Sequence, residues 1–557
     1  MYAGKQVKLK AREIANEGGV VQGQGGVELV AGGAILNTRG GLIAGQEVSL
    51  TAQSLTQDDA DVVAGSKTRA GDLELKIQGA VINRNNASMQ ASGQLMLEAG
   101  GRLVNGEGAR LVGDSVSLKT TGASDNAGLV YAKRTLTVKA KGGVTNQAAP
   151  KSASTSAPTQ TATQPATQTG DDEGALLYGG DGVSVTAGGT LVNGKGARIV
   201  GGNVALDAQA LRNEGGTLRA GIAGAPVATG TSAIPGAANA NAAGTKGHLT
   251  IKTSGDVVNR EQGLMLAMGK LAIDAANVDN TTQSRIVARD VDIDARGNVG
   301  NLDSAIEADG TLAIDAETIV NRKKAAAPAA AAASSSSSSA PAPATPSGQI
   351  GALNVTLKAR QSLDNAGRIE GGNVTVTTEA LHNRAAGEIL GQGGLVDIGT
   401  HTYDNAGKIH STQAAKLTLT QGANLEIDAA LKLPTADQWL ALKANDITVG
   451  RDLASAGDLV LEASGAIRNR AAVLAGGSLA LNSKKGMSNE AGALLYAGKN
   501  LFVEDKTSLV NHSDAEMLAQ GHVVLKGGDV RNAAGARISA GEDLLVQADS
   551  LTNEAQY

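Results

Sequence analysis

The feature that most constrains this 557-residue chain is a short phrase, two mostly apolar residues followed by asparagine, that recurs at nearly constant intervals. Asn83, Asn105, Asn126 and Asn146 follow one another at spacings of 22, 21 and 20 residues, and the same spacing runs on to Asn553. A fixed period of about 21 residues indicates a repeat architecture, in which each unit packs only against its neighbours.

The positions inside one repeat are also fixed. After Asn37, glycines follow at Gly40 and Gly45, and an alternating run of apolar and polar residues at 48–52 ends the unit. Alternation with a period of two is typical of a strand with one buried face, and glycine permits sharp corners. A unit this small cannot bury its apolar face alone. The sequence therefore predicts an all-β fold, a right-handed parallel β-helix (solenoid) of about 21-residue coils stacked about 4.8 Å apart.

Composition agrees with a thin core made of aliphatic side chains. Hydrophobic residues make up 41% of the chain, but it contains one Phe, one Trp and no Cys. The lack of cysteine excludes a disulfide scaffold and a thiolate metal site. The formal net charge of −5 argues against a general nucleic-acid binder, so we expect no nucleic-acid partner.

The recurring asparagine has a predicted structural role. Stacked coils place equivalent residues above one another, where side-chain amides can form hydrogen bonds between coils. The residues assigned to this structural ladder are Asn37, Asn83, Asn105, Asn193, Asn213, Asn259, Asn321, Asn383, Asn511 and Asn532.

Nine of the ten prolines fall in three low-complexity segments, 147–173, 222–247 and 323–348. Their composition offers too little apolar surface to offset the entropy of ordering, so we expect flexible insertions. The spacing from Asn146 to Asn193 is 47 residues, one period plus roughly one insertion, so the register continues on the far side. We therefore expect one continuous β-helix over residues 1–557. The least regular stretch, 424–445, contains Pro434 and Trp439, where we expect the coil to bulge.

The unit L-x-N-x-x-G-x-I-x-A-G-x-x-L-x-L-x-A resembles the haemagglutinin repeat of filamentous haemagglutinin-like exoproteins, and residues 103–109, 193–208 and 530–548 match it well. The resemblance implies a secreted fibre at the surface of a Gram-negative bacterium, exported by an outer-membrane two-partner secretion transporter through an amino-terminal domain. We interpret the chain as an internal fragment of such an exoprotein.

The resemblance implies two alternative functions. The first is a segment of a fibrous adhesin, a rigid β-helical rod that attaches to host cells or other bacteria through surface receptors, glycans among them. The second is the stalk of a contact-dependent growth-inhibition toxin whose toxin domain lies outside this chain. We expect no catalytic residues and no cofactor, although some parallel β-helices are polysaccharide lyases.

Two charged clusters are candidates for binding. Asp274, Asp294 and Asp315 follow one another at offsets of 20 and 21 residues, which predicts an outward carboxylate ladder that is either a cation site or an ordinary solvated face. A basic cluster could contact sulfated glycans through charge. It consists of Lys119, Lys133, Arg134, Lys139 and Lys141.

Overall fold

The computed structural model describes residues 1–148, 174–221, 247–323 and 348–555, and every regular element among them is a β-strand. These residues separate into two compact units, residues 1–296 and residues 297–557. The predicted insertions coincide almost entirely with 149–173, 222–246 and 324–347, which lie outside the described residues.

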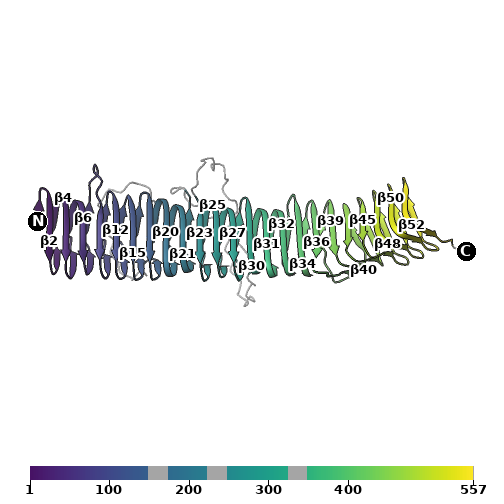
Figure 1. Ribbon diagram of the computed structural model, residues 1–557, viewed down its shortest axis with the longest axis horizontal. Helices are drawn as coiled ribbons and strands as arrows, with labels where there is room; N and C mark the ends of the chain where they lie inside the picture. Colours follow the sequence, from purple (N-terminus) through teal and green to yellow (C-terminus); the bar gives the residue numbers. More distant parts are fainter. Residues whose placement is uncertain (149–173, 222–246, 324–347, 556–557) are drawn as a thin grey trace, which may run out of the picture. The chain divides into compact units, whose positions relative to one another are not determined.

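The coils of the first unit run along three walls. One coil consists of β10 (Val81–Arg84), β11 (Ser88–Ala91) and β12 (Gln94–Ala99). These strands pair in parallel with the next coil, which consists of β13 (Leu103–Asn105), β14 (Arg110–Gly113) and β15 (Ser115–Thr120). Figure 1 shows β12 and β15 side by side. We call the walls first, second and third in this order. The predicted parallel β-helix is confirmed.

Alternation along each strand builds the core. In β12, Leu95, Leu97 and Ala99 point inward and are buried, whereas Met96 and Glu98 face outward. Burying a leucine side chain contributes about 1.5–3 kcal/mol, and every coil repeats this contribution. The core is aliphatic, and the single phenylalanine, Phe502, lies outside with 42% of its surface exposed.

The coil register continues on the far side of a segment that is not described. β19 (Val144–Asn146) pairs with the end of β20 (Leu176–Asn193), which places Asn146 opposite Asn193. In the second unit, β30 (Thr311–Arg322) pairs with β31 (Gln349–Ala366) in the same way. In both units, the asparagine before such a segment and the asparagine after it are therefore register partners.

The second wall of the second unit is interrupted. β35 (Lys408–Ser411) pairs with the two-residue strand β38 (Thr435–Ala436) only at His410 and Ser411. Pro434 directly precedes β38, and proline has no N–H group to donate to a ladder.

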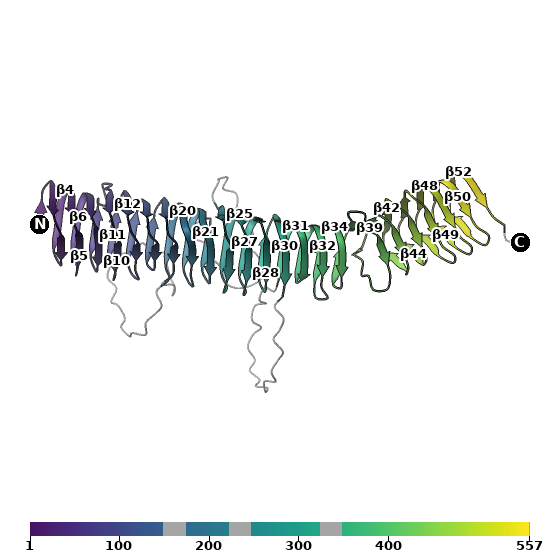
Figure 2. The ribbon, with the colours of Figure 1, turned by 60° about the horizontal axis from the view of Figure 1, so that its bottom comes forward.

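A separate sheet of five strands follows this interruption, and Figure 2 shows its strands β44 and β49. Its members are β41 (Leu453–Ser455), β44 (Ala472–Ala475), β47 (Leu494–Ala497), β49 (Glu516–Ala519) and β51 (Arg537–Ala540). Among the described residues, no helix is long and apolar enough to cross a membrane.

Candidate functional sites on the solenoid walls

The first wall carries a buried column of asparagine amides. The Nδ2 of Asn193 donates to the Oδ1 of Asn213 at 2.8 Å, and the Nδ2 of Asn213 donates to the Oδ1 of Asn259 at 2.7 Å. All ten predicted ladder residues make such bonds, namely Asn37, Asn83, Asn105, Asn193, Asn213, Asn259, Asn321, Asn383, Asn511 and Asn532.

Several of these amides also fix the turn that follows their first-wall strand. The Nδ2 of Asn37 lies 3.1 Å from the carbonyl oxygen of Gly41 and 3.1 Å from that of Asp61 on the next coil. A Cβ atom added to Gly41 would lie 2.4 Å from the Oδ1 of Asn37, so glycine is required for this close approach. The ladder therefore links side chains and backbone of successive coils.

The ladder is interrupted in two places. Gln57 takes the ladder position between Asn37 and Asn83, accepting a bond from Asn37 at 2.9 Å but making none with Asn83 among the described residues. In the second unit, Ile427 and Val449 occupy the two positions that precede Asn469 in the column.

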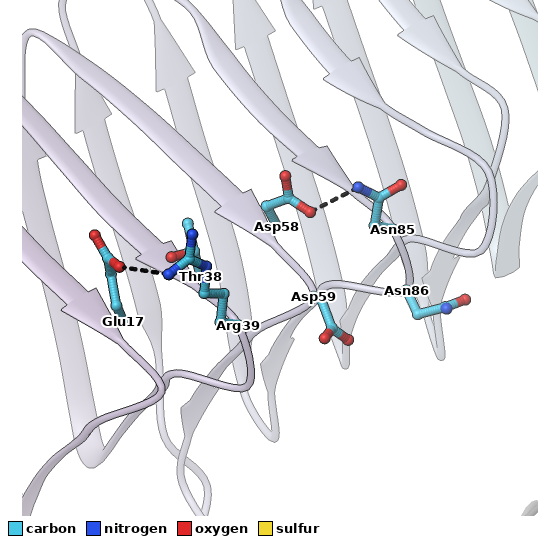
Figure 3. Close-up of a pocket in the computed structure, with 7 residues that line it drawn as sticks. All are labelled: Glu17, Thr38, Arg39, Asp58, Asp59, Asn85 and Asn86. Atoms are coloured by element: carbon cyan, nitrogen blue, oxygen red, sulfur yellow. Dashed lines mark hydrogen bonds and ion pairs between the residues drawn. The ribbon is translucent and has the colours of Figure 1, made fainter.

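A polar cleft of about 630 Å³ lies at the corner between the first and second walls, beside the first interruption. It is built from the residues one to three positions after the ladder residue on four consecutive coils. Figure 3 shows their side chains. We call it the corner cleft. Its lining residues are Glu17, Thr38, Arg39, Asp58, Asp59, Asn85 and Asn86.

Ion pairs and hydrogen bonds organise part of this cleft. Arg39 contacts Glu17 at 3.2 Å, and the Nδ2 of Asn85 donates to the Oδ1 of Asp58 at 2.6 Å. Arg84 contacts the other carboxylate oxygen of Asp58 at 2.8 Å. The bond from Asn85, together with the Arg84 guanidinium, holds the pKa of Asp58 below its ordinary value. Asp58 therefore remains ionised in mildly acidic solution.

Left-handed backbone directs the remaining side chains outward. Arg39, Asp59, Asn85 and Asn86 have φ angles of 55°, 49°, 54° and 62°, a region that residues other than glycine, asparagine and aspartate rarely occupy. The Asp59 carboxylate and the Asn86 amide are exposed and make no hydrogen bond with the described residues. The carboxylate can accept hydrogen bonds from a hydroxyl-rich ligand, and the amide can both donate to such a ligand and accept from it.

The structure separates the predicted basic cluster into paired and unpaired cations. Lys119 and Lys139 are register neighbours on β15 and β18 (Thr135–Ala140). Lys119 contacts Glu98 at 3.1 Å, and Arg134 contacts Asp114 at 2.6 Å. The cations that make no ion pair with the described residues are Lys133, Lys139 and Lys141, and they lie along β18 and at its two ends.

The predicted aspartate ladder is largely neutralised by basic side chains. Asp274 and Asp294 are register partners, and Arg296 contacts Asp274 at 3.2 Å. Asp315 belongs to the second unit, where it contacts Lys358 at 2.7 Å and also pairs with Arg360. No three acidic, histidine or cysteine side chains converge as a metal site requires in the part of the chain that the structure describes. The cation ladder stays a prediction.

Sequence reasoning did not identify the corner cleft. A partial signal was present, because several first-wall turns place glycine in the left-handed position, for example Gly108, Gly196 and Gly215. Around the cleft, Arg39, Asp59, Asn85 and Asn86 also adopt this conformation. Polar residues in the left-handed positions of consecutive turns could have indicated a polar surface at one corner.

Comparison with known proteins agrees with this architecture. The haemagglutinin repeat family model matches residues 435–501 and 485–554. Filamentous hemagglutinin of Bordetella pertussis is 34% identical over 145 residues, which cover 26% of this chain and 4% of that protein. Deoxyribonuclease CdiA of Dickeya dadantii is 25% identical over 566 aligned positions, which cover 94% of this chain and 14% of that protein. No solved structure matches the chain.

The fold is that of a β-solenoid protein, and the haemagglutinin repeat matches it over residues 435–554. The chain is therefore similar to filamentous haemagglutinin-like proteins, and the homologues of this kind are secreted cell-surface proteins of Gram-negative bacteria. It spans only a small part, 4% and 14%, of the two curated relatives named above.

Proposed function

We propose that this chain is a segment of a fibrous cell-surface adhesin that attaches a bacterium to host cells or to other bacteria. The observation that carries the proposal is the repetition of one coil through both units, which exposes long outer walls and fills the interior with aliphatic side chains. Such walls offer many equivalent contact points, and multivalent contact raises avidity without any tight single site.

The proposal includes a receptor class and a route of export. The corner cleft presents unpaired carboxylate and amide groups to solvent, which suits the hydroxyl groups of a surface glycan. Export by an outer-membrane transporter of a two-partner system follows from the family resemblance. We propose no catalytic role, because the polar side chains lie on exposed walls, where some form ion pairs between coils, as Lys119 does with Glu98.

The second candidate is the stalk of a contact-dependent growth-inhibition toxin. The match to the CdiA protein favours it, because that match covers 94% of the chain. In this case the chain would act as a spacer, and binding and toxicity would belong to other parts of the protein.

Binding of the purified, fluorescently labelled chain to epithelial cells, Gram-negative bacteria and a glycan panel distinguishes the two functions. An adhesin segment binds at least one of these surfaces. Its binding persists when the surface is washed at physiological salt, because salt screens hydrogen bonds less than it screens surface charge. A spacer binds none of them.

Variants of the corner cleft test the receptor class. Asp59→Gly and Asn86→Gly remove the free side chains, and glycine keeps the left-handed backbone. Glu107→Ala is the matched control, because Glu107 occupies the equivalent corner position of the next coil outside the cleft. Loss of glycan binding in the glycine variants alone supports the cleft, and equal binding by all variants contradicts it.

A further inference from the structure

A second cleft, of about 410 Å³, opens in the second wall of the second unit where Pro434 interrupts strand pairing. We call it the wall cleft. Its floor consists of the core side chains Ile409, Ile427, Leu440 and Leu453, which belong to four different strands. A cavity of this volume with an apolar floor is typical of sites for small ligands.

The cleft is held open by a specific set of contacts. Asn405, the last ladder residue before the interruption, directs its Nδ2 to the carbonyl oxygen of Lys432 at 2.9 Å. The Tyr403 hydroxyl donates to the same oxygen at 2.8 Å, and burial raises the pKa of Tyr403, which keeps it a donor. These bonds fix the segment that carries Lys432 and Pro434 against the wall.

The rim of the cleft is positively charged. Lys408, Lys432 and Arg451 line it, and none of them forms an ion pair with a carboxylate among the described residues. Lys432 donates to the carbonyl oxygen of Ala406 at 2.9 Å and Arg451 to that of Leu431, so both ammonium and guanidinium charges remain uncompensated. The buried Nε of Arg451 has no hydrogen-bond partner. Asp452 is the one acidic residue in the lining.

We propose that the wall cleft binds a small amphipathic anion, a single acyl chain that ends in a carboxylate or a similar acidic group. The apolar floor accommodates the chain, and the three cations attract the head group. An uncharged chain would leave those cations without a partner, so the head group distinguishes the preferred ligand. This inference does not depend on the adhesin proposal.

The single tryptophan of the chain gives a direct readout. Trp439 is half-buried and adjoins Leu440 in β39 (Trp439–Ala444). Titration of the intact chain with 11-(dansylamino)undecanoic acid should produce saturable energy transfer from Trp439 to the dansyl group. Dodecanoate should displace this probe at concentrations at least about fivefold lower than dodecanol does, because an exposed ionic contact contributes about 1 kcal/mol.

Three substitutions at exposed positions leave the core untouched. Lys408→Glu should weaken probe binding about fivefold or more, whereas Lys485→Glu, at an exposed position outside the cleft, should not change it. Ala454→Phe, at an exposed lining position, should fill the entrance and abolish transfer. The absence of energy transfer would overturn the proposal. So would energy transfer that dodecanol abolishes as effectively as dodecanoate does, and that Lys408→Glu and Ala454→Phe leave unchanged, because the probe would then bind independently of charge and of the cleft.

Discussion

Gln57 and Asn83 are register neighbours in a buried column of amides, yet the Nε2 of Gln57 and the Oδ1 of Asn83 do not bond to each other. Both side chains are fully buried, and neither of these atoms has another partner among the described residues. A buried donor and a buried acceptor left unpaired cost free energy on each side of the gap. This pair is therefore a point where one substitution can stabilise the first unit.

Gln57→Asn should stabilise the first unit by about 1 kcal/mol, because the shorter side chain can continue the ladder from Asn37 to Asn83. The reverse change, Asn105→Gln, should destabilise it by a similar amount. Urea unfolding followed by circular dichroism measures both. A lower midpoint for Gln57→Asn would show that the glutamine is better accommodated than its missing bonds indicate.

Removal of one ladder amide should cost more than removal of an exposed one. Asn511 is buried and bonds to Asn489 and Asn532, both at 2.8 Å, so Asn511→Ala leaves buried groups unpaired on two coils. We expect a loss of about 1–3 kcal/mol, with faster hydrogen exchange in β48 (Leu501–Asn511) and β50 (Val523–Asn532). Asn482→Ala, at an exposed position of the same unit, is the control. Equal effects of the two substitutions would refute a stabilising role for the ladder.

The turn glycine next to a ladder amide should not tolerate a methyl group. A Cβ atom at Gly387 would lie 2.3 Å from the Oδ1 of Asn383, whereas at Gly399 its nearest neighbour would be 3.9 Å away. Gly387→Ala should therefore destabilise the second unit by about 1–3 kcal/mol, and Gly399→Ala should have little effect. Thermal unfolding compares them. Similar melting temperatures for the two variants would mean that the turn relaxes without disturbing the ladder.

Acid should weaken the second unit through Asp505, whose side chain is 1% exposed. Burial alone would raise the pKa of Asp505, but hydrogen bonds from Ser483, Thr507 and Gly486 outweigh it and lower the pKa below the ordinary value of 3.8. A lowered native pKa stabilises the fold above pH 3.8, and this contribution is lost as the pH falls through the native pKa.

Asp505→Asn should be less stable than the parent chain by about 2–4 kcal/mol at pH 7, because an amide nitrogen would face groups that donate. The difference between the two proteins should shrink as the pH falls below 3.8. Urea midpoints at pH 7, 4 and 3 test this. A difference that stays constant with pH would show that the Asp505 charge does not contribute.

Much of the fold could be predicted from the sequence because its determinants are local and repeated. The spacing of Asn146 and Asn193 was enough to place them opposite one another, and Leu95 and Leu97 alternate in the way that defines a half-buried strand. The sequence also indicated an irregular region at 424–445, the stretch that contains Pro434 and Trp439.

The sites were harder to predict because each depends on contacts between coils. The corner cleft combines turn residues of four coils, so no single repeat shows it. Arg296 neutralises Asp274 from a position 22 residues later, which the spacing of the aspartates did not reveal. The wall cleft exists because Pro434 breaks one wall while Lys408 and Arg451, from neighbouring coils, remain at its rim.

The most direct test of the central claim, that the exposed walls of this chain bind a cell surface, is a binding isotherm of the intact chain on epithelial cells at low and at physiological salt. If the chain is an adhesin segment, binding should be saturable, and its dissociation constant should change little between low and physiological salt. Uptake that rises linearly with concentration, or that disappears at physiological salt, would contradict the claim and assign the chain the role of a spacer.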